Sequence, residues 1–200
     1  FSYLGMIATV ILLTLVMLGA LMPGKPSRNW PVFFLLGAGF MLVETKGITE
    51  LGLQFGNTWQ VIGVVIAGIL LMAYLANLAV QRLDVRRPAI LFLLLVVTLL
   101  AGYFMARSGG FDSTVSGRIF AVLLLTSPLF FSGILFSTVL RSGGDIAGIM
   151  SANLFGAMCG GLLEYNAMRF GYTFLYLLAM VVYGMAALFL FRGRIQKIGR

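Results

Sequence analysis

Seven apolar stretches follow one another along the chain, separated by short polar or glycine- and proline-rich breaks. Each stretch is close to the roughly 20 apolar residues that a helix needs to cross the hydrocarbon core of a bilayer. No stretch alternates apolar and polar residues, so the pattern does not favour strands. It predicts spanning helices over residues 2–22, 30–53, 59–80, 88–105, 117–140, 145–168 and 172–191.

The amino-acid composition indicates the fold class to which these helices belong. Hydrophobic residues make up 60% of the 200-residue chain and charged residues only 10%, against about 25% charged in a soluble domain. A soluble fold of this size has too much surface to hide such an apolar excess. We therefore expect one all-α domain over residues 1–200, a polytopic transmembrane helix bundle whose first partner is the lipid bilayer.

The net charge of +8 raises the question of nucleic acid, but the basic residues sit in the short breaks between apolar stretches. That arrangement sets the orientation of membrane proteins, so no nucleic-acid partner is expected. With seven helices, one side collects Lys25, Arg28, Arg82, Arg86, Arg87, Arg141, Arg192, Arg194, Lys197 and Arg200, and the other Arg107, Arg118 and Arg169. The positive-inside rule then places the carboxyl terminus in the cytoplasm and the amino terminus outside.

The chain lacks the side chains on which much enzyme chemistry depends. Histidine is absent, which removes the usual general base and the commonest metal ligand. The single cysteine, Cys159, lies in an apolar stretch, so an intramolecular disulfide is impossible. We predict no catalytic residue, no metal site and no cofactor.

The second predicted span carries three ionisable residues, Glu44, Lys46 and Glu50. Each costs about 2.5–3.5 kcal/mol at mid-membrane, so they should face protein or water and be paired. Lys46 and Glu50 are four residues apart on one helix face, where an ion pair can form, and Gln54 continues that face. Glu44 lies about 200° around the helix from Lys46 and needs another partner.

The sixth predicted span carries small residues at a spacing of four. Ala152, Gly156, Gly160 and Glu164 share one face, and Gly156 and Gly160 form a GxxxG step of the kind that lets helices approach closely. Glu164 should lie at a depth similar to that of Glu50, since both are about four residues from the same end.

Two further groups complete the candidate residues. Gly37 and Gly39 in the second span are interpreted as close-packing positions, because the third glycine of a dinucleotide motif is missing and no strand precedes them. Asn153 and Asn77 are expected to add buried amides.

Two interpretations of the intramembrane polar residues remain open. Glu44, Lys46, Glu50 and Glu164 could form a site between helices that binds a cation or carries protons. The favoured interpretation is a buried ion-pair and hydrogen-bond cluster that fixes helix packing.

Three segments carry a resemblance: Phe33 to Val61 (FFLLGAGFMLVETKGITELGLQFGNTWQV), Ser127 to Asp145 (SPLFFSGILFSTVLRSGGD) and Ser151 to Tyr165 (SANLFGAMCGGLLEY). They resemble the carboxyl-terminal membrane region of bacterial spermidine-synthase-like integral membrane proteins, over about residues 30–190. The resemblance implies the bacterial cytoplasmic (inner) membrane and a transporter-like part that is fused, in that family, to an aminopropyltransferase-like domain. The catalytic signature of that soluble domain is absent here, so the resemblance implies no catalytic residue. In the fused proteins the soluble domain directly precedes the first helix, which would put the amino terminus inside, against the charge count.

Three functions therefore compete. The favoured one is a non-catalytic membrane module, an anchor or an accessory subunit of a larger membrane complex with protein partners. The alternative is a transporter-like domain for a cation or polyamine that uses the intramembrane carboxylates. An enzyme domain is the least favoured and would need a second domain.

Overall fold

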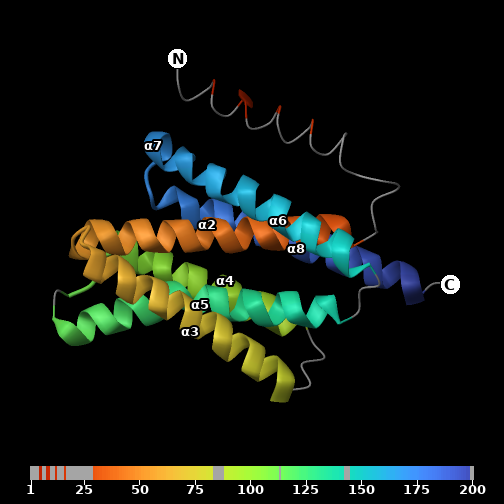
Figure 1. Ribbon diagram of the computed structural model, residues 1–200, viewed down its shortest axis with the longest axis horizontal. Helices are drawn as coiled ribbons and strands as arrows, with labels where there is room; N and C mark the ends of the chain where they lie inside the picture. The colour runs from red at the N-terminus through yellow and green to blue at the C-terminus, as the bar shows by residue number, and fades with distance from the viewer. Residues whose placement is uncertain are drawn as a thin grey trace.

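The regular structure of the described chain is entirely helical. The computed structural model describes residues 29–82, 88–112, 114–141 and 145–198, the last six as backbone only, and five positions before residue 29. The long helices are α2 (Trp30–Phe55), α3 (Trp59–Arg82), α4 (Pro88–Arg107), α5 (Val115–Leu140), α6 (Ile146–Leu163) and α8 (Phe174–Ile198). A 3-10 turn, η1 (Glu164–Asn166), and the short α7 (Ala167–Phe170) join α6 to α8. The long helices lie roughly side by side in one bundle (Figure 1).

Six segments of the described chain are long and apolar enough to cross a membrane, with η1 and α7 completing the α6 span. The predicted class, an all-α polytopic transmembrane bundle, is confirmed, and the protein is an integral membrane protein whose outer face contacts lipid. The predicted first span, residues 2–22, lies outside the described residues apart from Gly5, Ala8, Thr9, Leu12 and Val16, which are helical. The single-domain organisation and the cytoplasmic carboxyl terminus stay predictions.

Helix ends follow the local sequence. Pro31 lies in the first turn of α2, where its missing N–H would have no helical partner. Thr114 and Asp145 cap α5 and α6, accepting hydrogen bonds from the backbone N–H groups of Gly117 and Gly148 at 3.2 and 3.1 Å. Gly56 ends α2 at a φ of 97°, a conformation that strongly favours glycine. These signals hold the connections short, so consecutive spans run in opposite directions.

Helix α5 continues through Pro128 without a break. A proline at this position removes the N–H that would bond the carbonyl of Leu124, four residues earlier. The hydroxyl of Ser127 donates to that carbonyl at 2.7 Å and replaces the missing donor. In a hydrocarbon environment such a replacement is needed, because no water can satisfy the carbonyl.

Helix α2 is the centre of the bundle. It packs against α3, α5, α6 and α8. Of its most apolar 18-residue segment 61% is buried inside the bundle, against 22% for the corresponding segment of α3. Figure 1 shows α2 in orange running through the bundle, with α6 and α8 on one side and α3, α4 and α5 on the other. The span that carries Glu44, Lys46 and Glu50 is thus also the best shielded from lipid.

The contact between α2 and α6 brings two backbones together. A Cβ atom added to Gly156 or Gly160 would overlap the backbone carbonyl of Phe34 or Ala38, and one added to Gly37 would overlap that of Asn153. From Phe34 against Gly156 to Ala38 against Gly160, the residue numbers increase in the same direction on both helices, so α2 and α6 run parallel. Gly39 faces α8 instead, where a Cβ would lie 2.7 Å from the Tyr183 ring. The four glycines predicted to pack closely therefore all lie at helix contacts.

We expect Gly156→Ala to lower the free energy of unfolding by about 1–3 kcal/mol, the usual cost of overpacking. The obstacle is the Phe34 backbone, which cannot rotate away as a side chain would. Thermal unfolding in detergent, followed by circular dichroism, measures the loss. The control is Gly63→Ala on α3, where nothing lies within 4 Å of the added Cβ. Equal melting temperatures for the two variants would contradict the close packing of α2 and α6.

Candidate functional site

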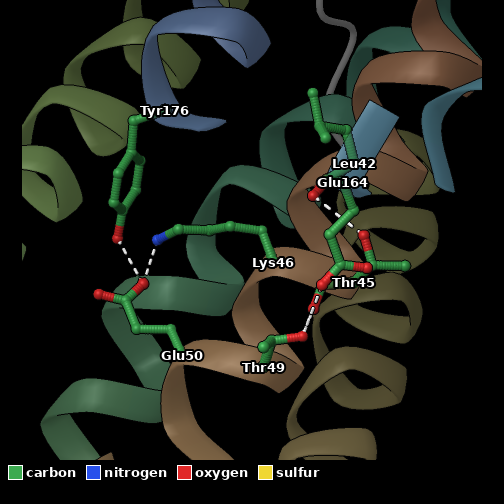
Figure 2. Close-up of polar contacts among 7 residues, drawn as sticks. All are labelled: Leu42, Thr45, Lys46, Thr49, Glu50, Glu164 and Tyr176. Atoms are coloured by element: carbon green, nitrogen blue, oxygen red, sulfur yellow. Dashed lines mark hydrogen bonds and ion pairs between the residues drawn. The ribbon is translucent and has the colours of Figure 1, made fainter. Parts of the chain in front are cut away.

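The polar cluster of the bundle is built around an ion pair within α2. Lys46 and Glu50 are joined by a salt bridge, with 4% of the Lys46 side chain and 15% of the Glu50 side chain exposed. From α8, the hydroxyl of Tyr176 donates to the same carboxylate oxygen of Glu50 at 2.9 Å. Figure 2 shows both side chains converging on Glu50. The pair predicted from the i, i+4 spacing is therefore present, and a third group completes it.

The aromatic ring of Tyr176 also contacts the cation. Lys46 Nζ lies 3.0 Å from the ring centroid, a cation–π contact in a desolvated place. Gly102 on α4 makes room for this ring, because a Cβ there would lie 2.7 Å from it. The ammonium is thus held between a carboxylate and a π face, so its charge is balanced without water.

A small cavity adjoins Lys46 where α2, α4, α5 and α8 meet. Its volume is about 10 Å³, close to the smallest space that can hold one water molecule. Thr98 and Tyr176 line it together with apolar side chains such as Leu99 and Leu125. The cavity therefore has room for about one water molecule.

A second polar contact joins α2 to the end of the α6 span. Thr49 donates to Glu164 Oε1 at 2.6 Å and to the carbonyl of Thr45 at 2.9 Å. Thr45 in turn bonds the carbonyls of Met41 and Leu42. In Figure 2, Thr49 and Glu164 lie apart from the Lys46–Glu50–Tyr176 group. Glu164 therefore lies at the level of Glu50, and Thr49 provides its link to α2.

Two residues predicted for the cluster lie elsewhere. Gln54 donates to the backbone carbonyl of Phe111 at 2.9 Å and so ties the end of α2 to the α4–α5 connection. Asn153 is half-buried at the α2–α6 contact beside Gly37, two turns or more from Glu164 along α6. Helical spacing places Gln54 on the same face of α2 as Lys46. Because α2 ends at Phe55, Gln54 lies next to the α4–α5 connection and not within the bundle.

The expectation of a buried amide at Asn77 is wrong, because this residue is exposed. It lies on α3, which leaves most of its surface to the surroundings. Asn77 is five residues, or about 8 Å, from the end of the helix. Near a helix end an amide can reach the polar boundary of the membrane, so it does not need a partner inside the bundle.

Glu44 lies apart from all of these groups. It is half-buried, and within the described residues it makes no hydrogen bond or ion pair. Its position opposite Lys46 on α2 places it away from the only lysine of the span. The expectation that Glu44 needs a partner other than Lys46 therefore stays a prediction.

Tyr176 and Thr49 were not singled out from the sequence. Tyrosine near a span end is usually an interfacial anchor, and a threonine in a helix usually bonds its own backbone. The same holds for Tyr183 on α8, which is fully buried and donates to Ser132 Oγ of α5 at 3.0 Å. The sequence does indicate that the carboxylates of Glu50 and Glu164 need hydrogen-bond donors. It does not indicate which helix supplies those donors.

The described chain offers no group of three or more metal-ligating side chains. Of the three span carboxylates, two already accept hydrogen bonds from their own chain, at Glu50 and Glu164. Such an arrangement suits the fixing of helices α2, α6 and α8 relative to one another.

Comparisons with protein-family models, with curated proteins and with solved structures find no match for this chain. The resemblance to spermidine-synthase-like proteins therefore stays a prediction.

We expect the single variants Lys46→Met and Glu50→Leu each to lower the free energy of unfolding by about 3–5 kcal/mol, because each leaves an uncompensated buried charge. The double variant Lys46→Met/Glu50→Leu removes both charges and should cost less than the sum of the singles. Unfolding in detergent micelles measures all three.

The matched control for this double-mutant cycle is Arg107→Gln, an exposed cation that contacts only Tyr103 among the described partners. It should change the unfolding free energy by less than about 0.5 kcal/mol. Additive losses in the Lys46/Glu50 cycle would show that the ion pair is not coupled.

Proposed function

We propose that the protein is a non-catalytic integral membrane module, an anchor or an accessory subunit of a larger membrane complex. What supports this most directly is the internal balance of the Lys46–Glu50–Tyr176 group. A site that takes up cations needs a carboxylate that can be exposed to them. Here Lys46 neutralises Glu50, and the adjoining cavity has room for about one water.

Glu44 supports the involvement of a protein partner. A half-buried carboxyl in the middle of a span, without a bond among the described residues, leaves a polar group to be satisfied in hydrocarbon. A neighbouring helix that supplies a hydroxyl, an amide or a cation would remove this cost. The proposal therefore assigns Glu44 to the contact with a partner subunit.

The composition supports a role without catalysis. A chain without histidine, with its one cysteine inside an apolar stretch, has few groups for acid–base or nucleophilic chemistry. The resemblance to the membrane region of spermidine-synthase-like proteins fits the same proposal, since there the chemistry belongs to a separate soluble domain. An orientation with the carboxyl terminus in the cytoplasm, and a bacterial cytoplasmic membrane, are parts of this proposal.

Mild detergent extraction from the native membrane tests the proposal. We expect the chain to co-purify with a partner at fixed stoichiometry, and Glu44→Leu to abolish this while the chain remains folded. Glu164→Gln is the matched control, because it keeps an oxygen that can accept the Thr49 hydrogen bond. Blue-native electrophoresis and mass spectrometry of the excised band measure the outcome. A stable monomer without partners, from wild type and variant alike, would contradict the proposal.

The second candidate function is transport of a cation or polyamine through the carboxylates Glu44, Glu50 and Glu164. The observation in its favour is again the unsatisfied Glu44, which could be the point of first contact with a cation. Transport would require the Lys46–Glu50 pair to open during the cycle, because Glu50 is otherwise neutralised.

Uptake of labelled spermidine by proteoliposomes distinguishes the two functions. The transport hypothesis predicts uptake above that of empty vesicles, reduced at least tenfold in Glu44→Gln and in Glu50→Gln. Arg107→Gln, outside the polar cluster, should leave the rate unchanged. No uptake by the wild type, or wild-type rates in both glutamate variants, would reject transport and leave the module.

A further inference from the structure

Glu44 lies close to the middle of the α2 span, far from both membrane boundaries. It follows Trp30 by fourteen residues and precedes Phe55 by eleven, so about 16 to 21 Å of helix separate it from either end. It shares a helix face with Gly37 and Met41, both of which adjoin α6. Because its side chain is half-buried, the carboxyl lies on the lateral surface of the bundle beside α6.

The sequence positions of the chain's own cations put them out of reach of this carboxyl. Lys46 is bound by Glu50 on the opposite side of α2. Every other lysine and arginine lies in a break between apolar stretches, within one turn of a span end or beyond it. Residues 2–22, the predicted first span, contain no lysine or arginine. An ion pair with Glu44 therefore requires a cation from another molecule.

A second copy of the chain does not supply that cation. Its only cation near mid-membrane is Lys46, whose side chain is 4% exposed and joined to Glu50. Its remaining lysines and arginines are at the membrane boundaries, as in the first copy. The source is therefore a different protein.

The charges at mid-membrane favour a cation over a neutral donor. On α2, two carboxylates, Glu44 and Glu50, face a single lysine. A hydroxyl or an amide would donate a hydrogen bond to Glu44 and leave its charge unbalanced, whereas an ammonium or guanidinium does both. Of the five described residues before Asn29, only Thr9 carries a donor side chain, and its hydroxyl donates to the Gly5 carbonyl at 2.8 Å.

From these observations we propose that the partner is a different membrane-spanning protein with a lysine or arginine at the depth of Glu44, and that this cation forms an ion pair with Glu44 beside α6. The inference rests on the proposed function, which assigns Glu44 to a partner subunit. It adds the charge and the depth of the group that the partner presents.

Synthetic transmembrane helices test the acceptor directly. The probes are helices of about 20 leucines with one central lysine, one central glutamine or no substitution. Energy transfer between a fluorophore on the helix and one at the carboxyl terminus of the full chain, in phosphatidylcholine vesicles, measures their affinities. We expect the lysine helix to bind about tenfold more tightly than either other helix, the effect of one charge-assisted hydrogen bond. Glu44→Gln should remove this preference.

Two matched controls separate Glu44 from the other carboxylates and from the general surface. Glu164→Gln, which changes a carboxylate at the end of the α6 span, should keep the lysine preference. A helix with its lysine moved by seven residues, about 10 Å along the same face, should bind like the leucine helix. Equal affinities of the three helices for the wild type, or an unchanged lysine preference in Glu44→Gln, would overturn the ion pair.

The complex extracted from the native membrane distinguishes this inference from the proposed function. Glu44→Gln keeps the size and hydrogen-bonding capacity of the side chain but not its charge, so the yield of co-purified partner should fall about tenfold, while Glu44→Asp should retain the partner. Full retention by Glu44→Gln, or a second copy as the partner, would refute the cationic partner and leave the module intact. A wild-type chain without any partner would refute the module and this partner together.

Discussion

Hydrocarbon offers no hydrogen-bond partners, and this constraint governs where the polar groups of the bundle lie. Within the described residues, no buried side-chain nitrogen or oxygen lacks a hydrogen-bond partner. The ammonium of Lys46 is enclosed by Glu50 and Tyr176, and Ser127 replaces the donor that Pro128 removes. The satisfied groups connect α2 to α6 and α8, so a requirement of the lipid environment also determines which helices are held together.

The close approach of α2 and α6 makes the polar contacts possible. Glycines on both helices let backbone meet backbone, and any side chain at Gly156 or Gly160 would push the helices apart. The Thr49–Glu164 hydrogen bond, at 2.6 Å, lies further along the same pair of helices. A hydrogen bond tolerates only a few tenths of an ångström in distance. The packing of the small residues therefore fixes the separation at which Thr49 can reach Glu164.

The sequence predicted the elements well, because apolar length and the turn residues at helix ends are local signals. The same local reasoning identified Lys46 and Glu50 as a pair, since an i, i+4 spacing needs no knowledge of the fold. Contacts between helices could not be predicted in this way. That Tyr176 completes the pair, that Thr49 binds Glu164, and that Gln54 turns to the α4–α5 connection all depend on which helices are neighbours. A GxxxG step indicates that some helix comes close, but it does not identify α2 as that helix.

The position of the ion pair bears on the proposed role as a membrane module. Breaking a buried pair is costly, whereas replacing both partners by apolar residues is often neutral, so such a pair is weak evidence for a purely stabilising role. The pair does constrain how α8 is rotated relative to α2. Lys46 of α2 and the Tyr176 hydroxyl of α8 can contact the same Glu50 oxygen only in one rotational register of the two helices. Gly39 on α2 requires that same register, because a Cβ there would lie 2.7 Å from the Tyr183 ring of α8. Helix α8 is thus set by two independent contacts, one polar and one steric, and a defined outer surface follows from them. A module that acts by presenting a fixed face to a partner needs this definition more than it needs additional stability.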